Sequence, residues 1–348
     1  MNDKTILVDI TKTVNDILGS IEHEREREII SRRFGLFDRK ETLEQIGELL
    51  GITRERVRQL EKVILTRLKL SAKEGKLSGI NELQSILKET INDHGGIMRV
   101  SELGLYLTKA NSKIDQAQVY FVSEMCPDLI VIPDSDIFYQ SIGILAMHDA
   151  AEIKKLVDMI TATIKKIGVQ TSIEKVTSEF GSDLGTQRIR ALASISKQLA
   201  TLNGKWGLIK WPTVNPKNIR DKIYVILKEE ESPLHFNKIS EAIKKSSFKR
   251  KDVTTQAIHN ELIKDKRFVL IGRGIYALKE WGYEKGTVAD IIANVLRKAN
   301  KPLHRDEIIK EVLKSRFVKE TTILLNLQGK SQFKRVAKAT YNLDESVN

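Results

Sequence analysis

The apolar positions between residues 42 and 68 form two helical stripes separated by a glycine. The stripes lie at Leu43, Ile46 and Leu50 in a first helix and at Val57, Leu60, Ile64 and Leu68 in a second. Gly51 stands where the chain must turn, and Ile52 can fill the angle between the helices. Thr42 and Gln45 have the spacing of a capping box, and Thr53 can cap the second helix. The segment is therefore predicted to fold as helix, turn and helix.

The opposite face of the second helix carries side chains of the kinds that recognise DNA. At 100° per residue, this open face contains Arg54, Glu55, Arg58, Gln59 and Lys62. Arginine can bind guanine through two hydrogen bonds, glutamine can bridge adenine, and glutamate can accept from cytosine. The alternative is a solvated helix face, which explains most charged stripes. Because the glycine turn, the two caps and the base-reading side chains occur together, DNA binding is the favoured interpretation.

Residues 17–70 resemble region four of bacterial primary sigma factors. The resemblance rests on the stretches 24–28, 33–36, 42–47 and 51–61. It implies a helix-turn-helix that reads the minus-35 promoter element and docks on the flap of the RNA polymerase β subunit.

The resemblance also implies roles for individual residues. Arg54, Glu55 and Gln59 would contact bases, and Thr42, Arg56 and Arg58 would hold the DNA backbone. The predicted DNA-binding set of this segment is Thr42, Thr53, Arg54, Glu55, Arg56, Arg58, Gln59 and Lys62. The polymerase-docking surface would come mainly from the helix around Glu22 to Phe34.

Beyond residue 79 the chain repeats loosely, about every 65 to 70 residues. Each unit begins with an amphipathic helix and ends with two short apolar runs around a turn. The expected units are 80–143, 150–212, 218–281 and 286–343. The predicted turns are Asp134-Ser135-Asp136, Asn203-Gly204-Lys205 and Gly272-Arg273-Gly274. Three helices followed by a hairpin is the plan of a winged helix.

These observations predict a mainly α fold, in which the helix-turn-helix is followed by a tandem array of about four winged-helix modules. Residues 71–79 are polar and contain two glycines, so a linker is expected there. Residues 1–16 form a short lead-in, which is compatible with a strand-like arm and with a helix.

The third and fourth units share a Pro-Leu-His sequence after their first helix, at residues 233–235 and 302–304. This feature and the run 267–278 resemble the HARE-type winged helix, which is similar to the N-terminal domain of the RNA polymerase delta subunit. The match is best over 218–281. Because His235 and His304 recur at the same place, a structural role at a helix start is expected for both.

The formal net charge of +12 lies in the C-terminal third of the chain. Residues 1–77 carry a net charge of +2, residues 78–213 of −1 and residues 214–343 of +13. A surface with this charge favours polyanions, with nucleic acid first and acidic protein second.

The densest basic cluster contains Lys249, Arg250 and Lys251. It is either a solvated loop or a phosphate-binding loop ahead of a recognition helix near 254–263. Arg273 lies at a predicted hairpin tip, where it could enter a minor groove, but an exposed turn residue is the favoured interpretation.

Catalysis, metal binding and membrane insertion find no support in the sequence. Cys126 is the single cysteine, the six histidines lack metal-ligand spacing, and no nucleophile, base and oxyanion set can be assembled. No run is long and apolar enough to cross a bilayer. We therefore expect a cytoplasmic, non-enzymatic protein without cofactor, metal, membrane or small-molecule substrate.

Two functions follow from these features. The favoured one is a DNA-binding transcription factor related to sigma factors, with promoter-like double-stranded DNA and the RNA polymerase core, through its β flap, as partners. The alternative is a delta-like RNA polymerase accessory subunit whose winged helices bind protein. Arg54→Ala or Gln59→Ala should abolish sequence preference in the first case and be silent in the second.

Overall fold

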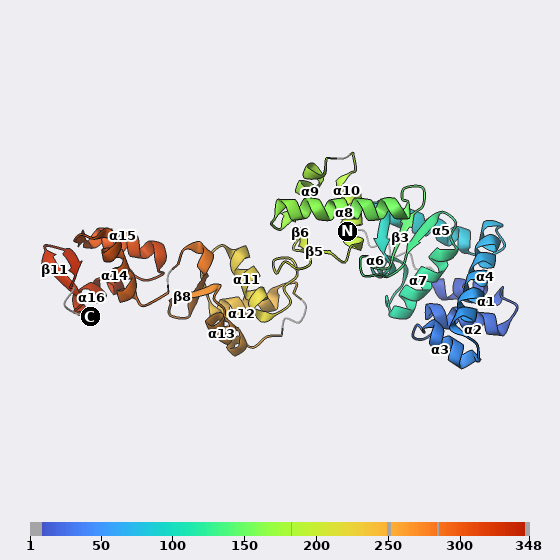
Figure 1. The fold of residues 1–348 in the computed structure, drawn as a ribbon, viewed down its shortest axis with the longest axis horizontal. Helices are drawn as coiled ribbons and strands as arrows, with labels where there is room; N and C mark the ends of the chain where they lie inside the picture. Colours follow the sequence, from blue (N-terminus) through green and yellow to red (C-terminus); the bar gives the residue numbers. More distant parts are fainter. Residues whose placement is uncertain (1–8, 182, 249–251, 284, 345–348) are drawn as a thin grey trace. The chain divides into compact units, whose positions relative to one another are not determined.

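The computed structural model describes residues 9–181, 183–248, 252–283 and 285–344 in two compact units, Met1–Ile209 and Lys210–Asn348. Within the described residues there are sixteen α-helices and twelve short strands, so the predicted mainly helical class is confirmed (Figure 1). None of the described helices combines the length and the apolar character that a membrane-spanning segment needs.

The first unit begins with four helices. They are α1 (Ile10–Gly19), α2 (Glu24–Phe34), α3 (Leu43–Leu50) and α4 (Arg54–Lys73). For residues 10–16 of the lead-in, the question is decided in favour of a helix, because Ile10, Val14 and Ile17 are buried at helical spacing in α1. Residues 1–8 lie outside the described residues. Ile17 was the predicted start of the sigma-like segment, and that boundary falls inside α1.

The prediction of a linker at residues 71–79 is wrong for its first three residues, which belong to α4. The buried stripe of Ile64 and Leu68 continues at Ala72, and Leu77 beyond the helix end is buried as well. These apolar contacts keep the helix intact through Lys73 and hold the following residues against the core.

Four repeats with one order of elements follow. Each contains a helix, a short strand, two more helices and a hairpin, and the short strand pairs antiparallel with the last strand of the hairpin. The helices and the hairpin were predicted for every repeat, whereas the short strand was missed because it is only two or three residues long.

The first two repeats complete the first unit. The first repeat contains α5 (Ile80–Asp93), β1 (Ile97–Arg99), α6 (Val100–Leu107), α7 (Lys113–Met125), β2 (Leu129–Ile132) and β3 (Ser141–Ile144). The second contains α8 (Ala150–Ile167), β4 (Thr171–Ser172), α9 (Ile173–Phe180), α10 (Thr186–Ile195), β5 (Leu199–Leu202) and β6 (Lys205–Leu208).

The other two repeats form the second unit. The third repeat contains α11 (Ile219–Glu230), β7 (Leu234–His235), α12 (Phe236–Lys245), α13 (Thr255–Lys264), β8 (Phe268–Gly272) and β9 (Ile275–Leu278). The fourth contains α14 (Val288–Ala299), β10 (Leu303–His304), α15 (Arg305–Ser315), α16 (Glu320–Gly329), β11 (Phe333–Ala337) and β12 (Thr340–Leu343). His235 and His304 cap α12 and α15 by accepting from the amides of Asn237 and Asp306, so their predicted structural role is confirmed.

The predicted hairpin turns differ in outcome. Asn203 and Gly204 connect β5 to β6 with φ angles of 49° and 76°, which is the two-residue turn expected for Asn-Gly. Asp134-Ser135-Asp136 lies between β2 and β3, as predicted, but the connection is longer than a two-residue turn, because β3 begins only at Ser141. The intervening loop instead reaches the second repeat, where the Tyr139 amide donates to the Ile195 carbonyl over 2.9 Å.

Helices α1, α2 and α4 share one hydrophobic core with the first repeat. It includes residues of α1, the C-terminal half of α4, and all three helices and the hairpin of the first repeat. The side-chain amide of Gln118 in α7 donates to the Leu36 carbonyl over 2.9 Å, and Gln118 Oε1 accepts from Thr11 Oγ1 at the same distance. The helix-turn-helix is thus attached to the first repeat through packing as well as through the chain.

Candidate nucleic-acid interface

A small apolar cluster fixes the angle between α3 and α4. Ile29, Ile46 and Val57 are fully buried at its centre, and Ile52 packs against them from the turn, as predicted. Gly51 has a φ of 64°, which confirms the need for glycine at the turn. Gly47 was not singled out from the sequence, yet a Cβ atom there would lie 2.6 Å from the Ile52 carbonyl oxygen.

Both predicted helix caps are present. Thr42 Oγ1 accepts from the Gln45 amide over 3.3 Å, and Gln45 Oε1 accepts from the Thr42 amide over 2.9 Å, which completes a capping box. Thr53 Oγ1 accepts from the Arg56 amide over 3.2 Å at the start of α4. These bonds satisfy amides that an uncapped helix start would leave without partners.

The exposed face of α4 carries the residues that the sequence pattern predicted for it. The predicted contact residues of this helix are all exposed, namely Arg54, Glu55, Arg56, Arg58, Gln59 and Lys62. The buried side consists of Val57, Ile64 and Leu68, with Leu60 partly buried beside them.

Hydrogen bonds join several of the exposed side chains. Glu55 accepts two bonds from Arg58, of 2.7 and 2.8 Å, and one of 3.3 Å from Gln59. Arg54 forms an ion pair of 2.8 Å with Glu44 of α3. The hydrogen bond from Arg58, ahead of its positive charge, lowers the pKa of Glu55 to about 2, so this side chain is a carboxylate near neutral pH.

The helix α2 supports this face from behind. Arg25 Nη2 donates to the Leu50 carbonyl over 2.6 Å at the end of α3, and Arg33 forms an ion pair of 3.2 Å with Glu61 of α4. These contacts come from charged residues that the resemblance had placed in a docking surface.

The apolar side of α2 is covered by α7. The ring of Phe34 lies 5.0 Å from the ring of Phe121 and 6.2 Å from that of Tyr120, measured between centroids. Ile30 is fully buried in the shared core. The apolar part of the predicted docking surface around Glu22 to Phe34 is therefore occupied by the chain itself.

The predicted contact residues of the third repeat are only partly placed. Lys249, Arg250 and Lys251 lie outside the described residues. Arg273 is exposed between β8 and β9, as expected for a turn residue. The predicted recognition helix corresponds to α13, which Thr254 caps by accepting from the Ala257 amide.

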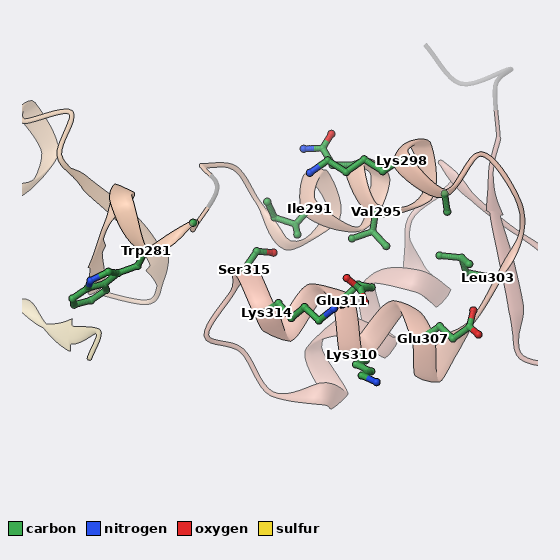
Figure 2. Close-up of a pocket in the computed structure, with 13 residues that line it drawn as sticks. Trp281, Ile291, Val295, Lys298, Leu303, Glu307, Lys310, Glu311, Lys314 and Ser315 are labelled. Carbon is green, nitrogen blue, oxygen red and sulfur yellow. Dashed lines mark hydrogen bonds and ion pairs between the residues drawn. The ribbon is translucent and has the colours of Figure 1, made fainter. Parts of the chain in front are cut away.

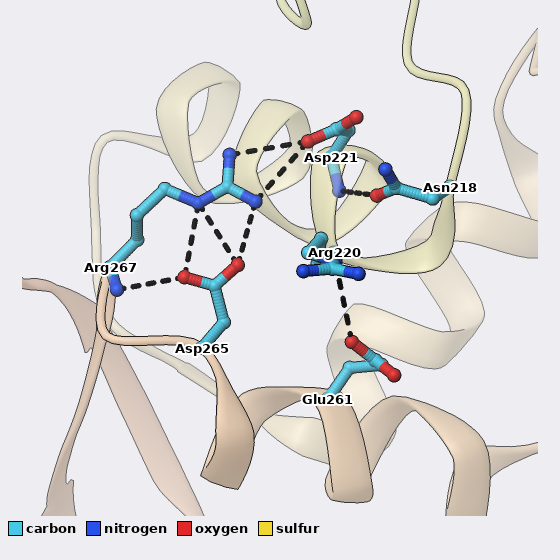
Figure 3. Close-up of polar contacts among 6 residues, drawn as sticks. All are labelled: Asn218, Arg220, Asp221, Glu261, Asp265 and Arg267. Atoms are coloured by element: carbon cyan, nitrogen blue, oxygen red, sulfur yellow. Dashed lines mark hydrogen bonds and ion pairs between the residues drawn. The ribbon is translucent and has the colours of Figure 1, made fainter.

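A network of charged residues positions α13 against α11 (Figure 3). The Arg267 guanidinium lies between two carboxylates, with bonds of 2.7 Å to Asp265 and 3.2 Å to Asp221, and Arg220 lies 3.6 Å from Glu261. The hydrogen bond from Arg267 lowers the pKa of Asp265, and the reciprocal bond raises the pKa of Arg267. These contacts hold α13 and the residues that follow it against α11.

The second unit also contains a groove of about 770 Å³ (Figure 2). Ile291, Val295 and Lys298 of α14 line it on one side, and Glu311 and Lys314 of α15 on the other. Glu311 and Lys314 form an ion pair of 2.6 Å. Its lining residues include neither histidine nor cysteine, and the described residues contain no cluster that could hold a metal ion.

Known proteins match the segment that contains the helix-turn-helix. Residues 23–70 match the family model described as Sigma-70, region 4. The chain is 36% identical over 74 residues to RNA polymerase sigma factor SigA from Bacillus sp, across 21% of this chain and 19% of that protein. It is 47% identical over 57 residues to RNA polymerase sigma factor sigB from Arabidopsis thaliana, across 16% of this chain and 9% of that protein.

The chain thus spans less than a fifth of the length of either curated relative. The matched segment begins at residue 23, after α1, and ends within α4. The segment that holds α2, α3 and most of α4 is therefore similar to region 4 of the sigma-70 factors, which confirms the resemblance predicted for this part of the chain.

Proposed function

We propose that this protein is a DNA-binding transcription factor related to sigma factors, and that α4 reads a promoter-like duplex. The observation that carries the proposal is the open face of α4, where arginine, glutamate and glutamine side chains are exposed at the start of a capped helix. An α-helix of this kind fits the major groove of duplex DNA. The similarity to Sigma-70, region 4 supports the same assignment.

The proposed roles follow the order of the side chains along the helix. Arg54, Glu55 and Gln59 contact bases, with a minus-35-like element as the target. Thr42, Thr53, Arg56, Arg58 and Lys62 hold the phosphate backbone and set the register. In the unbound protein Glu55 is bonded to Arg58 and Gln59, so binding exchanges these bonds for bonds to DNA.

We also propose that the four repeats are winged-helix modules, with the third and fourth of the HARE type found in the delta subunit. The common order of helix, strand, two helices and hairpin supports this fold, and so does the recurring Pro-Leu-His at β7 and β10. The proposed modules are 80–143, 150–212, 218–281 and 286–343, after a lead-in at 1–16 and the sigma-like segment at 17–70.

RNA polymerase is the second proposed partner, since both curated relatives are named as its sigma factors. In the delta-like alternative, the winged helices contact RNA polymerase, and α4 does not read DNA. Burial of Ile30 and of part of Phe34 under α7 disfavours docking through the apolar side of α2 in this arrangement. Sequence-specific DNA binding is therefore the primary proposal.

Selection of bound duplexes from a random pool, with and without core RNA polymerase, tests it. The wild-type chain should enrich one sequence motif, and Arg54→Ala and Gln59→Ala should each reduce that enrichment while the circular dichroism stays unchanged. Gln198→Ala, at an exposed position of the second repeat, is the control and should select the wild-type motif. A chain that enriches nothing in either condition contradicts the proposal.

A further inference from the structure

The hairpin of the fourth repeat is an exposed, strongly basic element. Lys334 and Arg335 lie in β11, Lys338 lies in the turn, and Lys330 lies between α16 and β11; all four are exposed. The strand anchors itself through Phe333, which is 6% exposed, opposite Leu343 of β12. The rest of β11 extends from this anchor into solvent.

No acidic residue lies within the stretch that contains these cations, and the next one along the chain is Asp344, directly after β12. Between residues 321 and 343 the sequence contains four basic residues and no aspartate or glutamate. No ion pair joins any of the four to a carboxylate among the residues that the structure describes. Arg335 Nε donates to the Ala337 carbonyl over 3.2 Å, which leaves the other guanidinium nitrogens available. The charge of the hairpin is therefore not neutralised within the described chain.

The corresponding hairpin of the third repeat is different. Val269, Ile271 and Ala277 form a second buried cluster there, covered by Trp281 and Tyr283. Arg316 Nη1 also donates to the Leu270 carbonyl over 2.6 Å, so a loop of the fourth repeat lies against this hairpin. Residues of the chain itself thus pack against the third hairpin, whereas the basic side chains of the fourth hairpin are exposed.

We propose that the β11–β12 hairpin binds the phosphate backbone of duplex DNA, as a second contact that adds affinity without reading sequence. A two-stranded ribbon fits within the major groove, and basic side chains along it can then reach phosphates. An acidic protein would need a desolvated apolar centre to bind with comparable strength. Of the exposed residues in β11, only Val336 is a large apolar one.

The inference rests on the proposed function only in naming duplex DNA as the ligand. Its test uses the full chain, a fluorescent duplex of random sequence, and anisotropy titrations at several potassium chloride concentrations. The combined variant Lys334→Gln, Arg335→Gln and Lys338→Gln should bind this duplex more weakly. Its plot of log K against log salt should be less steep by up to about 2.7, because up to three fewer phosphates are neutralised.

Two further variants distinguish this contact from α4. Lys154→Gln, Lys165→Gln and Lys166→Gln together remove the same charge from exposed positions of α8 and should leave a steeper slope than the hairpin variant. Gln59→Ala should lose motif preference and keep the wild-type slope for random duplex. If Gln59→Ala keeps its preference while the hairpin variant loses slope, the assignment to α4 fails and the hairpin contact stands.

A hairpin variant with the wild-type slope and affinity would overturn the inference. It is overturned equally if that variant binds duplex normally and loses only binding to core RNA polymerase, because the hairpin is then a protein contact. Lys334→Arg with Lys338→Arg keeps the charge and should retain the wild-type slope.

Discussion

Gln118 of α7 joins the first repeat to the helix-turn-helix by donating a hydrogen bond to the Leu36 carbonyl, 82 residues earlier in the chain. The side chain is 3% exposed and also accepts from Thr11 of α1. A buried amide with both ends bonded specifies one arrangement of the elements around it, since any other arrangement leaves buried polar groups without partners.

Gln118→Met should therefore destabilise the first unit by about 1–3 kcal/mol, since the volume is kept while the Leu36 carbonyl loses its donor. Urea unfolding followed by circular dichroism measures the change. Gln198→Met, at an exposed position of the same unit, is the matched control and should stay within about 0.5 kcal/mol of wild type. Equal midpoints for the two variants would mean that the Gln118 bonds contribute nothing to stability.

Glu55 is expected to limit how tightly α4 binds DNA of arbitrary sequence. Its carboxylate faces the same side as Arg58 and holds that guanidinium through two hydrogen bonds. Glu55→Gln removes a negative charge that repels phosphates and frees Arg58 to contact them. Random duplex should then bind more tightly, while discrimination falls by about 1–3 kcal/mol at the base pair that Glu55 reads.

Because the pKa of Glu55 is about 2, its carboxylate stays ionised at higher pH and should add no pH dependence to DNA binding between about pH 5 and 8. Anisotropy titrations of wild type and Glu55→Gln over this range provide the comparison. A difference between the two that changes with pH would show that the Arg58 bond does not hold the pKa of Glu55 low.

Gly47 should be essential to the angle between α3 and α4. A Cβ atom there would lie 2.6 Å from the Ile52 carbonyl, and that oxygen belongs to the turn backbone, which is fixed by the buried Ile46 and Val57. Gly47→Ala should cost about 1–3 kcal/mol through overpacking, despite the better helix propensity of alanine, and should weaken DNA binding because α4 is displaced.

The matched substitution Gly19→Ala tests whether the effect is specific. A Cβ atom at Gly19 would meet nothing within 4 Å, so this variant should be as stable as wild type or slightly more stable. Thermal unfolding and a duplex titration of both variants complete the comparison. The steric explanation fails if the two alanine variants behave alike.

The helix-turn-helix could be predicted in detail because its determinants are local. Caps at Thr42 and Thr53, the turn at Gly51 and the two apolar stripes lie within one short stretch, and each acts on neighbouring residues. The role of Gly47 escaped prediction, because it depends on how closely α4 approaches α3.

The covering of α2 by α7 could not be predicted, since the two helices are far apart in sequence. A signal was nevertheless present in α7, where buried residues are not confined to one stripe: Gln118, Val119, Phe121, Val122, Ser123 and Met125. A helix that is buried on more than one side needs a second packing partner, besides the sheet and the helices of its own repeat. That partner is the segment formed by α1, α2 and α4.

His148 should make the stability of the first unit depend on pH. Its ring is 3% exposed and lies close to Gly96 and Gly143 of the first repeat. Burial, reinforced by the positive charge of Arg188 and opposed by Glu152, lowers the pKa of His148 to about 4. The unfolded chain, with a histidine pKa near 6.5, therefore binds a proton more readily than the folded one.

The contribution of His148 should consequently be fully present above pH 6.5 and fall progressively as the pH decreases towards 4, by on the order of 2–3 kcal/mol in total. Urea unfolding at pH 7, 6, 5 and 4.5 measures this loss. His148→Phe should flatten the curve in this range whatever its stability at pH 7, because the phenyl ring cannot take up a proton. His23→Gln, at an exposed position, should follow the wild-type curve, and a wild-type slope in His148→Phe would assign the pH dependence to other groups.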